Sequence, residues 1–412
     1  MKNKKLKILS ISQVYCPDTA SVSQHLTDLL EALSRKGHDV SVYSSIRNYE
    51  NPKITYPSYQ IINNVKVNRI RNTGFGKKNK LSRLLDFFTF NVLIFIKIFF
   101  IKTKKFDLII GMTSPPLLSY IGIKLARFKK IKFVYWTMDL QPELSIVANY
   151  ISKGSKVSQL LQNRGDYIFR FSDRIIVLDS FMENHILNRI GRVDNKIDII
   201  PVWPVVKNLY EGDRLSNSFR IENNFKDKIV IMYSGNHSVM HPLTTLLEAA
   251  VQLRDDNRFL FVHIGGGVKL NEVIEYKEKH NLLNVITLPY QPRENIHISL
   301  ASADIQVVSL GNNCVGFTHP NKIYGSMFIG KPILYIGPND SHISKILDNC
   351  PGNISVNHGA ENLLVQLLDS FAKKEQLDKD LIGKNNKIYA NKFFHPEVLI
   401  SKMVNSIEST IN

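Results

Sequence analysis

Short apolar runs alternate with helix-length amphipathic segments along the first 200 residues. The run Lys7–Val14 predicts a buried strand, and a segment with apolar residues at helical spacing follows it and ends at Gly37. The apolar positions of that segment are Leu26, Leu29, Leu30 and Leu33. Further strand-like runs lie at Asp39–Tyr43, Asp107–Gly111, Lys132–Trp136 and Arg174–Leu178. Strand, loop, helix and strand in succession form the repeating unit of a doubly wound parallel sheet, so an α/β domain is predicted.

The same alternation begins again after residue 200. Ile199–Val205 contains Pro201 and Pro204, which favours a linker over a continuous strand. Strands are predicted at Lys228–Tyr233, Arg258–Ile264, Val285–Leu288, Ile305–Leu310 and Ile333–Ile336, with helices at Leu243–Leu253 and Ile296–Ala303. Two α/β halves in one chain predict a ligand cleft between them.

One segment, Leu84–Ile101, does not follow this alternation of strands and helices. Asp86 and Lys97 leave only ten uncharged residues between them, which is too short for a membrane-spanning helix. Basic residues flank the segment at Lys77, Lys78, Lys80, Arg83, Lys102, Lys104 and Lys105. An aromatic, apolar helix between basic clusters is typical of a segment lying in a membrane interface. The alternative is a helix packed against the sheet with a solvated charged rim, and the sequence leaves both open.

Composition places the chain among ordinary globular proteins. With 412 residues, 44% hydrophobic and 22% charged, it is long enough for two domains. Cys16, Cys314 and Cys350 show no metal-ligand spacing, so we expect a reducing, cytosolic setting and no zinc site. The N-terminal apolar stretch is too short for a signal peptide and is interpreted as the first strand.

The net charge of +17 is confined to the first half of the chain. Residues 1–200 contain 32 lysines and arginines against 15 aspartates and glutamates, whereas residues 201–412 contain 21 of each. Within 51–105 there are 12 basic residues and one acid. A basic patch of this kind suits a phosphate-rich partner, either nucleic acid or an anionic membrane surface.

The stretch Val315–Gly337 is the strongest candidate for ligand binding. A polar loop containing His319-Pro320-Asn321-Lys322 leads into a helix that should end at Gly330, and the predicted strand follows directly. The first amide groups of a helix have no intrahelical partner, and its N-terminus carries partial positive charge. We therefore expect this loop to hold an anion, specifically the diphosphate of a sugar nucleotide.

Taken in order, several short motifs make the chain resemble the family 4 glycosyltransferases, in the bacterial branch that builds O-antigen, capsule and colanic-acid-type polysaccharides. The resemblance runs nearly end to end. The motifs that resemble the family in the first half are Arg35–Val40, Thr113–Leu118 and Met138–Glu143. Those in the second half are Tyr233–His237, Pro289–Glu294, Ala303-Asp304 and His319–Tyr324.

The resemblance implies a GT-B fold, in which two Rossmann-like domains face each other across a cleft and a C-terminal helix crosses back. The implied domains are an acceptor- and membrane-facing one at 1–203, a donor-binding one at 204–390, and the returning helix at 391–412. It further implies a nucleotide-sugar donor, most often a UDP-sugar, no metal or other cofactor, and retention of anomeric configuration.

Residue roles at the donor site follow from the same resemblance. Lys322 would pair with the donor diphosphate, where charge builds as the leaving group departs. Gly235 ends the first strand of the second domain and lets the backbone approach phosphate. The alternative for Lys322 is a surface lysine near a helix start, and the alternative for Gly235 is a plain turn. The other implied donor contacts are His319, Asn321, Asn236, His241, Gly325 and Tyr290.

The chain departs from the family at several of these positions. Phe317 and Gly325 stand where two glutamates are usual, the second of which contacts the nucleotide ribose. Asn236 and His241 occupy the usual arginine and lysine positions. His319 is a candidate donor to sugar or phosphate in compensation, with a solvated loop histidine as the alternative.

In the first half, Asp139 and Glu143 are the candidate catalytic residues. They lie four apart around Pro142 and could orient or deprotonate an acceptor hydroxyl. A helix N-cap ahead of Pro142 is the alternative for Asp139. Ala20 and Ser21 replace the family's paired glycines in the loop near donor phosphate or acceptor.

The predicted function is a glycosyltransferase, hexosyl or N-acetylhexosaminyl in type. It would act on a lipid-diphosphate-linked saccharide as a cytoplasmic protein peripheral to the inner face of the cytoplasmic membrane. A UDP-sugar 2-epimerase on the same fold and a non-catalytic nucleotide-sugar-binding homologue are the alternatives. No helix-turn-helix, zinc or aromatic-platform signature points to nucleic acid. Donor sugar, acceptor, linkage and oligomeric state are left open.

Overall fold

The computed structural model describes residues 5–49, 51–75, 80–101, 106–115, 117–193, 196–206 and 208–411. It leaves out the side chains of residues 80, 81, 83 and 84. Of the basic residues predicted to flank the apolar segment, Lys77, Lys78, Lys102, Lys104 and Lys105 lie outside the described residues, as does Pro116 of the Thr113–Leu118 motif.

The chain forms two compact units. The first comprises residues 1–201, 316–319 and 397–412, and the second comprises 202–315 and 320–396. The continuous range 204–390 expected for the second domain is therefore interrupted, because four residues of the anion-loop stretch fold with the first unit.

An eight-stranded sheet forms the centre of the first unit, in the order β3-β4-β2-β1-β5-β6-β7-β8. All neighbouring strands are parallel except β3 and β4. The strands are β1 (Lys7–Ile11), β2 (Asp39–Ser45), β3 (Tyr59–Ile62), β4 (Val65–Ile70), β5 (Leu108–Met112), β6 (Lys132–Trp136), β7 (Arg174–Val177) and β8 (Ile197–Ile199). Ile8 of β1 pairs with Val40 on one side and Leu108 on the other.

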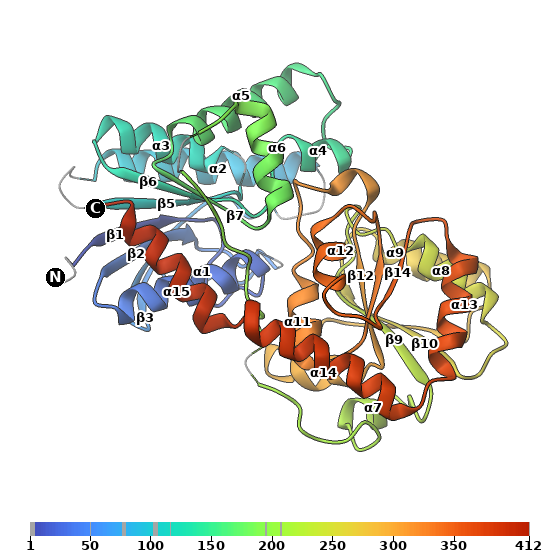
Figure 1. Ribbon diagram of the computed structural model, residues 1–412. Coiled ribbons are helices and arrows are strands. Elements are labelled where there is room, and N and C mark those ends of the chain that lie inside the picture. The colour runs from blue at the N-terminus through green and yellow to red at the C-terminus, as the bar shows by residue number, and fades with distance from the viewer. Residues whose placement is uncertain are drawn as a thin grey trace. The chain divides into compact units, whose positions relative to one another are not determined.

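Helices cover both faces of this sheet, because the strand order runs outward from β1 in both directions and right-handed crossovers then fall on opposite faces. Figure 1 shows α2, α3 and α5 over one face, and α1 with α15 over the other. The helices of this unit are α1 (Ser21–Arg35), α2 (Lys80–Phe99), α3 (Leu118–Phe128), α4 (Glu143–Val147), α5 (Lys156–Phe171), α6 (Ser180–Ile190) and α15 (Pro396–Ser409).

The Arg35–Val40 motif fixes the C-terminal helix to the first unit. His38 is buried, and its Nδ1 accepts a hydrogen bond from the Leu6 amide at 3.2 Å. Its Nε2 therefore carries the proton that bonds the Glu408 carboxylate of α15 at 2.8 Å. Lys36 pairs with the same carboxylate at 2.6 Å. Burial alone would raise the pKa of Glu408, but Lys36 and His38 lower it.

The second unit is built on a six-stranded parallel sheet, in the order β11-β10-β9-β12-β13-β14. Its strands are β9 (Ile229–Asn236), β10 (Phe259–Gly266), β11 (Val285–Leu288), β12 (Ile305–Ser309), β13 (Ile333–Ile336) and β14 (Ile354–Val356). Its helices are α7 (Ser218–Glu222), α8 (Thr244–Gln252), α9 (Leu270–Lys279), α10 (Ile296–Ala301), α11 (Lys322–Ile329), α12 (His342–Leu347), α13 (Glu361–Ala372) and α14 (Gln376–Phe393).

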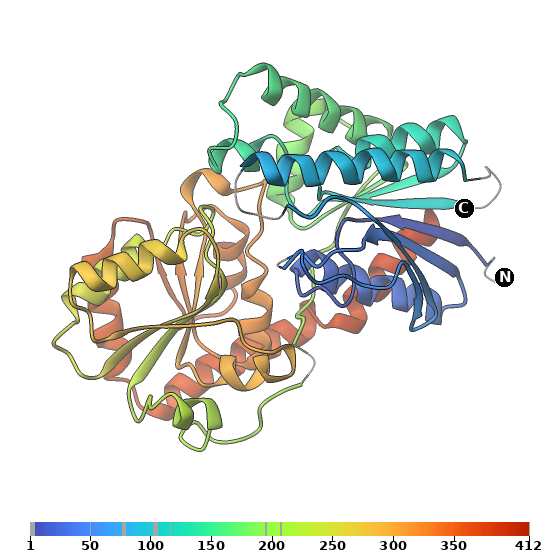
Figure 2. The ribbon, with the colours of Figure 1, turned by 180° about the vertical axis from the view of Figure 1, so that it is seen from behind.

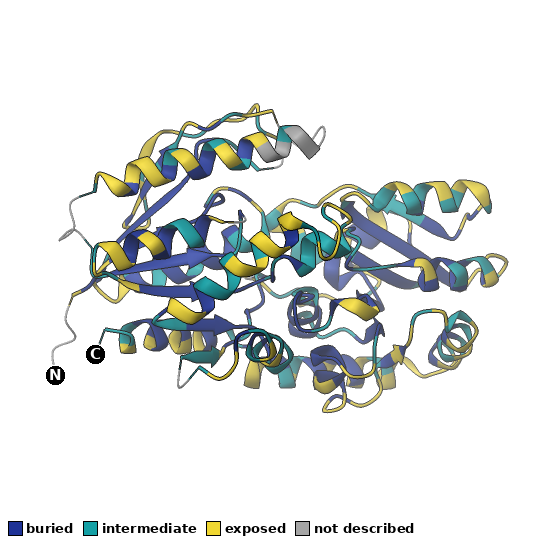
Figure 3. Ribbon diagram, turned by 90° about the horizontal axis from the view of Figure 1, so that it is seen from above, coloured by how far each residue is buried: buried dark blue, intermediate teal, exposed yellow. Residues whose placement is uncertain are grey.

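Side chains on the two faces of this sheet form two apolar clusters. Ile231 and Tyr233 of β9 contribute to a cluster with α8 and α13, whereas Val230 and Met232 pack with Phe225 on the opposite face. Most strands of both sheets are accordingly drawn as buried in Figure 3. Burial on both faces explains why these strands appear in the sequence as continuous apolar runs.

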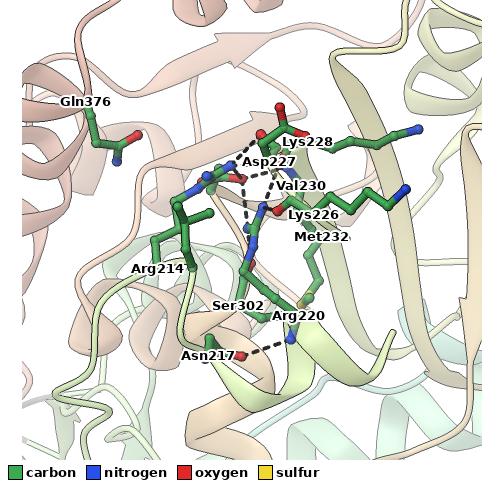
Figure 4. Close-up of polar contacts among 12 residues, drawn as sticks. Arg214, Asn217, Arg220, Lys226, Asp227, Lys228, Val230, Met232, Ser302 and Gln376 are labelled. Atoms are coloured by element: carbon green, nitrogen blue, oxygen red, sulfur yellow. Dashed lines mark hydrogen bonds and ion pairs between the residues drawn. The ribbon is translucent and has the colours of Figure 1, made fainter. Parts of the chain in front are cut away.

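The Ala303-Asp304 motif ends in a buried ion cluster (Figure 4). Asp304 accepts hydrogen bonds from Arg214, from Arg220 at 3.1 Å and from the Val230 amide at 2.7 Å. Arg220 is 1% exposed and also donates to the Ser302 carbonyl at 2.6 Å. This cluster ties the segment that enters the second unit to the start of β9.

The predicted α/β class with two Rossmann-like domains is confirmed. Ten predicted strands correspond to β1, β2, β5, β6, β7 and β9–β13, and α11 ends at Gly330 in the left-handed conformation as expected. β3, β4, β8 and β14 were not predicted from the sequence. A linker was predicted over Ile199–Val205, of which Ile199 closes β8.

The segment Leu84–Ile101 falls largely within α2, a helix with one buried face and one exposed face. Phe90, Ile94 and Ile98 are buried against the unit, while the opposite face is exposed. Figure 2 shows α2 as a long helix running across its layer. Among the described residues, no helix is both long and apolar enough to cross a membrane.

Candidate functional site

The carboxyl edge of the second sheet is where the anion-loop prediction can be examined. β9 and β10 run parallel and in register, so that Gly235 lies beside Gly265 and Asn236 beside Gly266. Loops that follow parallel strands meet at this edge, which is where open α/β sheets bind ligands. The Asn236 side chain is exposed there.

Lys322 is the first residue of α11 and lies along the end of β9. Its Nζ is 4.5 Å from the centre of the Tyr233 ring. A Cβ on Gly235 would lie 3.1 Å from Lys322 Cε and 3.2 Å from Nζ, so glycine leaves the room that this side chain occupies. Within the described part of the chain, no carboxylate lies within ion-pair distance of Lys322. Burial without an acid lowers its pKa to about 8.

Two histidines follow Gly235 in the loop after β9. His241 Nδ1 donates to the Ser309 carbonyl at 2.7 Å, which fixes the neutral tautomer with the lone pair on Nε2. Burial and the Lys322 charge lower the pKa of His241 to about 3 and that of His237 to about 4. Both rings are therefore neutral near pH 7, and Lys322 supplies the positive charge of this edge.

Consecutive glycines bring the end of β10 against β9. A Cβ on Gly265 would meet the Gly235 carbonyl oxygen at 2.2 Å, and one on Gly267 would meet the His237 carbonyl oxygen at 2.4 Å. Both residues also have positive φ. The glycines of this run are thus explained by close backbone packing. Tyr290, whose Oη donates to Gly266 at 3.4 Å, lies over this run and is 54% exposed.

The remaining donor-site candidates lie at the start of α11. Asn321 occupies the N-cap position, but its side chain does not cap the helix. Gly325 lies one turn into the helix, and a Cβ there would meet only Val206 Cγ2, at 3.8 Å. The position where the family carries a glutamate therefore has room for a side chain.

His319 and its neighbours fold with the first unit. His319 Nδ1 donates to the Asp179 carboxylate at 2.7 Å, and its side chain is fully buried. Asp179 also caps α6 by accepting from the Met182 amide at 2.8 Å. His319 is thus a buried, oriented histidine of the first unit, and the alternative of a solvated loop histidine is wrong.

Asp139 lies beside this segment. Its Oδ1 accepts a hydrogen bond from Thr318 Oγ1 at 2.8 Å, and the Leu140 amide donates to the Phe317 carbonyl at 2.8 Å. Burial raises the pKa of Asp139, against the lowering effects of Thr318 and His319. The N-cap of α4 is Pro142, so Asp139 does not cap that helix.

Glu143 is held in a network of its own. Both of its carboxylate oxygens accept from Arg189 Nη1, at 3.0 and 3.2 Å, and Oε1 also accepts from His185 at 2.8 Å. Burial would raise the pKa of Glu143, but these two partners lower it. A fully paired carboxylate with a lowered pKa is a weak proton acceptor, so Asp139 is the stronger of the two candidates for a general base.

Ala20 and Ser21 begin α1 in the first unit. Ala20 is the N-cap without a side-chain hydrogen bond, and Ser21 is exposed. The predicted small-residue loop therefore leads to an open helix N-terminus.

Sequence reasoning missed Thr318, Asp179 and Tyr233 as site residues. Thr318 and Asp179 are ordinary polar residues whose partners are distant in sequence. Tyr233 belonged to a quoted motif, but its contact with the Lys322 ammonium appears only in the folded unit.

The sequence profile described as Glycosyltransferase Family 4 matches residues 22–202, and the profile described as Glycosyl transferases group 1 matches residues 216–387. The chain is 23% identical over 385 residues to a probable glycosyltransferase, WbjE, of Pseudomonas aeruginosa, covering 92% of this chain and 91% of that protein.

Two further proteins resemble this chain, one in sequence and one in fold. A putative colanic acid biosynthesis glycosyl transferase of Escherichia coli K12, WcaI, is 23% identical over 84% of this chain and 87% of its own. The crystal structure of Anabaena HepE in complex with UDP and glucose superposes with a TM-score of 0.72 at 14% identity. That match covers 98% of this chain and all of the other, and at such low identity it shows a shared fold.

Proposed function

Since the chain belongs to the family 4 glycosyltransferases, we propose that it transfers a hexosyl or N-acetylhexosaminyl group from a UDP-sugar, with retention, to a lipid-diphosphate-linked saccharide of a bacterial surface polysaccharide. The names of two relatives support this direction, since WcaI is described by colanic acid biosynthesis and HepE was crystallised with UDP. No metal or other cofactor is needed in this proposal.

The observation that carries the proposal is the lysine at the start of α11. An ammonium group that is partly buried, has no acid partner among the described residues and lies at a helix N-terminus is arranged to receive an anion. The diphosphate of a nucleotide sugar supplies two phosphates. The absence of a side chain at Gly235 leaves the room that the Lys322 side chain occupies.

Bond cleavage at the donor sugar increases negative charge on the departing diphosphate. Lys322 and the first amides of α11 would stabilise that charge more strongly in the transition state than in the ground state. Asp139, whose pKa burial raises, is proposed to orient or deprotonate the acceptor hydroxyl.

A thermal-shift screen of the purified protein with UDP, GDP, CMP and ADP tests the donor site. Stabilisation by UDP that Lys322→Ala abolishes is expected, because ligand binding raises the melting temperature only where the site exists. Lys279→Ala, an exposed lysine on α9, is the matched control and should retain the shift. A UDP shift of wild-type size in Lys322→Ala would contradict the assigned site.

The two alternative functions give different products. A transferase consumes UDP-sugar only with a lipid-diphosphate-linked acceptor, a 2-epimerase releases free UDP without one, and a non-catalytic homologue binds UDP and does neither. Incubation with a panel of UDP-sugars, with and without acceptor, distinguishes the three by product analysis. Retention of activity in excess EDTA tests the metal independence.

We further propose that the first unit docks on an anionic membrane surface through α2 and α3. The exposed apolar face of α2 comprises Leu85, Phe88, Val92, Phe95, Ile96 and Phe99, and the exposed Phe100 follows the helix. Phe128, which ends α3 and is 74% exposed, stacks on Phe99 at 6.4 Å between ring centres. Exposed aromatic rings of this kind insert at the headgroup level of a bilayer.

Charge on these two helices favours the same partner. Lys97, Lys124 and Arg127 are exposed, whereas Asp86 is the single acid in the two helices and is buried. A cationic surface around exposed aromatics is attracted to anionic phospholipid.

Co-sedimentation with vesicles of phosphatidylglycerol and of phosphatidylcholine measures this docking. We expect binding to the anionic vesicles that Phe95→Glu combined with Phe99→Glu removes. Leu283→Glu, at a 91% exposed position of the second unit, should not affect it. Equal binding of all three proteins, or none by the wild type, would exclude the surface.

A further inference from the structure

Tyr233 is a buried aromatic residue that lies directly beside the cation of the second unit. It belongs to β9, it is fully buried, and its ring centre is 4.5 Å from Lys322 Nζ. Alternate residues of a strand face the same side, so Gly235 lies next to Tyr233 on that side. A Cβ on Gly235 would be 3.2 Å from the same nitrogen atom. The ammonium group therefore rests on the Tyr233 ring and against the Gly235 backbone.

The Tyr233 ring is held in one orientation. Its Oη donates to the Asn236 carbonyl at 2.8 Å, and the ring of His237 packs edge-on against it at 4.7 Å between ring centres. His263, the register partner of Tyr233 on β10, lies 6.4 Å away between ring centres. The rings of Tyr233, His237 and His263 are all fully buried. A ring fixed in this way presents a fixed face to the ammonium group.

The ring attracts the cation without occupying its hydrogen-bond donors. In the part of the chain that the structure describes, Lys322 Nζ has neither an ion-pair partner nor a hydrogen-bond acceptor. Nζ is also not one of the enclosed polar atoms, so a ligand can reach it. The negative face of an aromatic ring attracts a cation, whereas a carboxylate would neutralise the charge and accept from its N–H groups. The three N–H groups of Lys322 thus stay available for phosphate oxygens.

The neighbouring titratable groups do not replace this attraction. Burial, and after it the Lys322 charge, lowers the pKa of His237 to about 4 and that of His241 to about 3, so both rings are neutral near pH 7. Burial also raises the pKa of the Tyr233 hydroxyl, and Tyr290 faces that hydroxyl electrostatically. Tyr233 therefore stays protonated where Lys322 titrates, near its lowered pKa of about 8. The partner of the ammonium group is a neutral ring and not a phenolate.

We propose that Tyr233 is a positioning residue of the donor site, whose ring face holds the Lys322 ammonium at the end of β9 and leaves its N–H groups for the diphosphate. This inference rests on the proposed function of that site in binding a nucleotide sugar. A cation that is already in place lowers the Kd for the ligand, because binding does not have to select one lysine conformation among several.

Two substitutions separate the ring from the hydroxyl. Tyr233→Phe keeps the ring face and loses the bond to the Asn236 carbonyl, whereas Tyr233→Leu removes the face. In calorimetric titrations at pH 7, Tyr233→Phe should bind UDP like the wild type, and Tyr233→Leu should bind about threefold to tenfold more weakly. The pH above which UDP binding weakens should also fall by about half a unit or more in Tyr233→Leu, because the ring no longer favours the charged lysine.

Phe259→Leu is the matched control. Phe259 is a fully buried ring at the start of β10, and the Arg258 guanidinium lies 5.2 Å from its centre. It therefore also has a cation on its ring, but at the opposite end of the strands from Gly235. Loss of either buried ring should lower the melting temperature, whereas UDP binding should change in Tyr233→Leu alone.

A graded series keeps the test decisive even if Tyr233→Leu does not fold. Phenylalanine carrying one, two or three fluorine atoms at position 233 nearly preserves the ring shape and progressively weakens the negative potential of its face. The protonation of Lys322 is measured without nucleotide, from the pH dependence of its acetylation by acetic anhydride, followed by mass spectrometry. The midpoint of this dependence should fall with each added fluorine atom.

The two measurements also distinguish failure of this inference from failure of the donor site. A constant acetylation midpoint across the fluorine series, or wild-type UDP affinity in a folded Tyr233→Leu variant, would overturn the positioning role. Absence of UDP binding by the wild type would instead count against the proposed donor site, and a falling midpoint would still show that the ring holds the ammonium.

Discussion

The candidate groups of the two units differ in how their charges are compensated. In the second unit, Lys322 lies at the sheet edge with no acid beside it among the described residues, and its neighbouring histidines are neutral. In the first unit, Asp139 has Thr318 as its hydrogen-bond donor, and Asp179 has His319.

An uncompensated cation costs stability unless a ligand pairs with it, whereas a carboxylate with a fixed donor is held in one orientation. The difference supports the proposal that the second unit receives an anion. The first unit is built to hold polar groups at defined positions.

The largest change is expected from replacing Asp139, the proposed proton acceptor of the first unit. Asp139→Asn should lower kcat by about 10²–10⁴-fold, because a general base contributes an effect of that size. The amide oxygen can still accept from Thr318, and burial penalises the carboxylate, so stability should be unchanged or higher.

Steady-state kinetics with a lipid-linked acceptor measures the Asp139→Asn effect, and the UDP thermal shift serves as the control for the second unit. Activity within threefold of the wild type would show that the buried acid only supports the fold.

The ion cluster of the second unit should contribute the largest stability effect. Asp304→Ala should cost about 3–5 kcal/mol of unfolding free energy, because it leaves the buried Arg220 without a counter-ion. Urea denaturation followed by circular dichroism measures the loss. Asp340→Ala, at an exposed acid of the same unit, is the control and should change little. An equally small loss of unfolding free energy in Asp304→Ala and Asp340→Ala would show that the ion cluster does not stabilise the fold.

UDP binding should weaken in alkaline solution. Lys322 has a lowered pKa of about 8 in the free protein, so its charge is present below that pH and is lost above it. A bound diphosphate favours the charged form, and the Kd for UDP should therefore rise up to tenfold per pH unit above about pH 8.

Calorimetric titrations from pH 7 to 9.5 test this dependence, with Lys322→Arg as the control because arginine keeps its charge. A flat profile for the wild type would mean that the ammonium does not contact the phosphates.

The smallest effect is expected from restoring a side chain at the position of the missing family glutamate. Gly325→Glu should raise unfolding free energy by about 0.5–1 kcal/mol, since glycine weakens a helix interior and the position has room. It should also tighten UDP binding if the carboxylate reaches the ribose. Gly325→Ala is the control for the helix effect alone. Equal UDP affinity in the two variants would show that the glutamate does not contact the ribose.

Local patterns in the sequence anticipated much of the fold because a strand buried on both faces must be a continuous apolar run. β6, β11 and β13 have the bounds that their apolar runs indicated. β3, β4, β8 and β14 were missed: β3 and β4 alternate exposed or half-buried residues with more buried ones, and β8 and β14 are each three residues long. The Lys322 site was also visible, because a lysine at a helix start after a polar loop is a local feature.

By itself, the sequence determined the two-domain α/β plan, the concentration of positive charge in the first half and the cation at the start of α11. Only the tertiary structure decided which charges are compensated. Glu143 became paired through Arg189, and His319 joined the first unit through Asp179. The physical reason is that compensation depends on partners far apart in the chain, and periodicity carries no information about them.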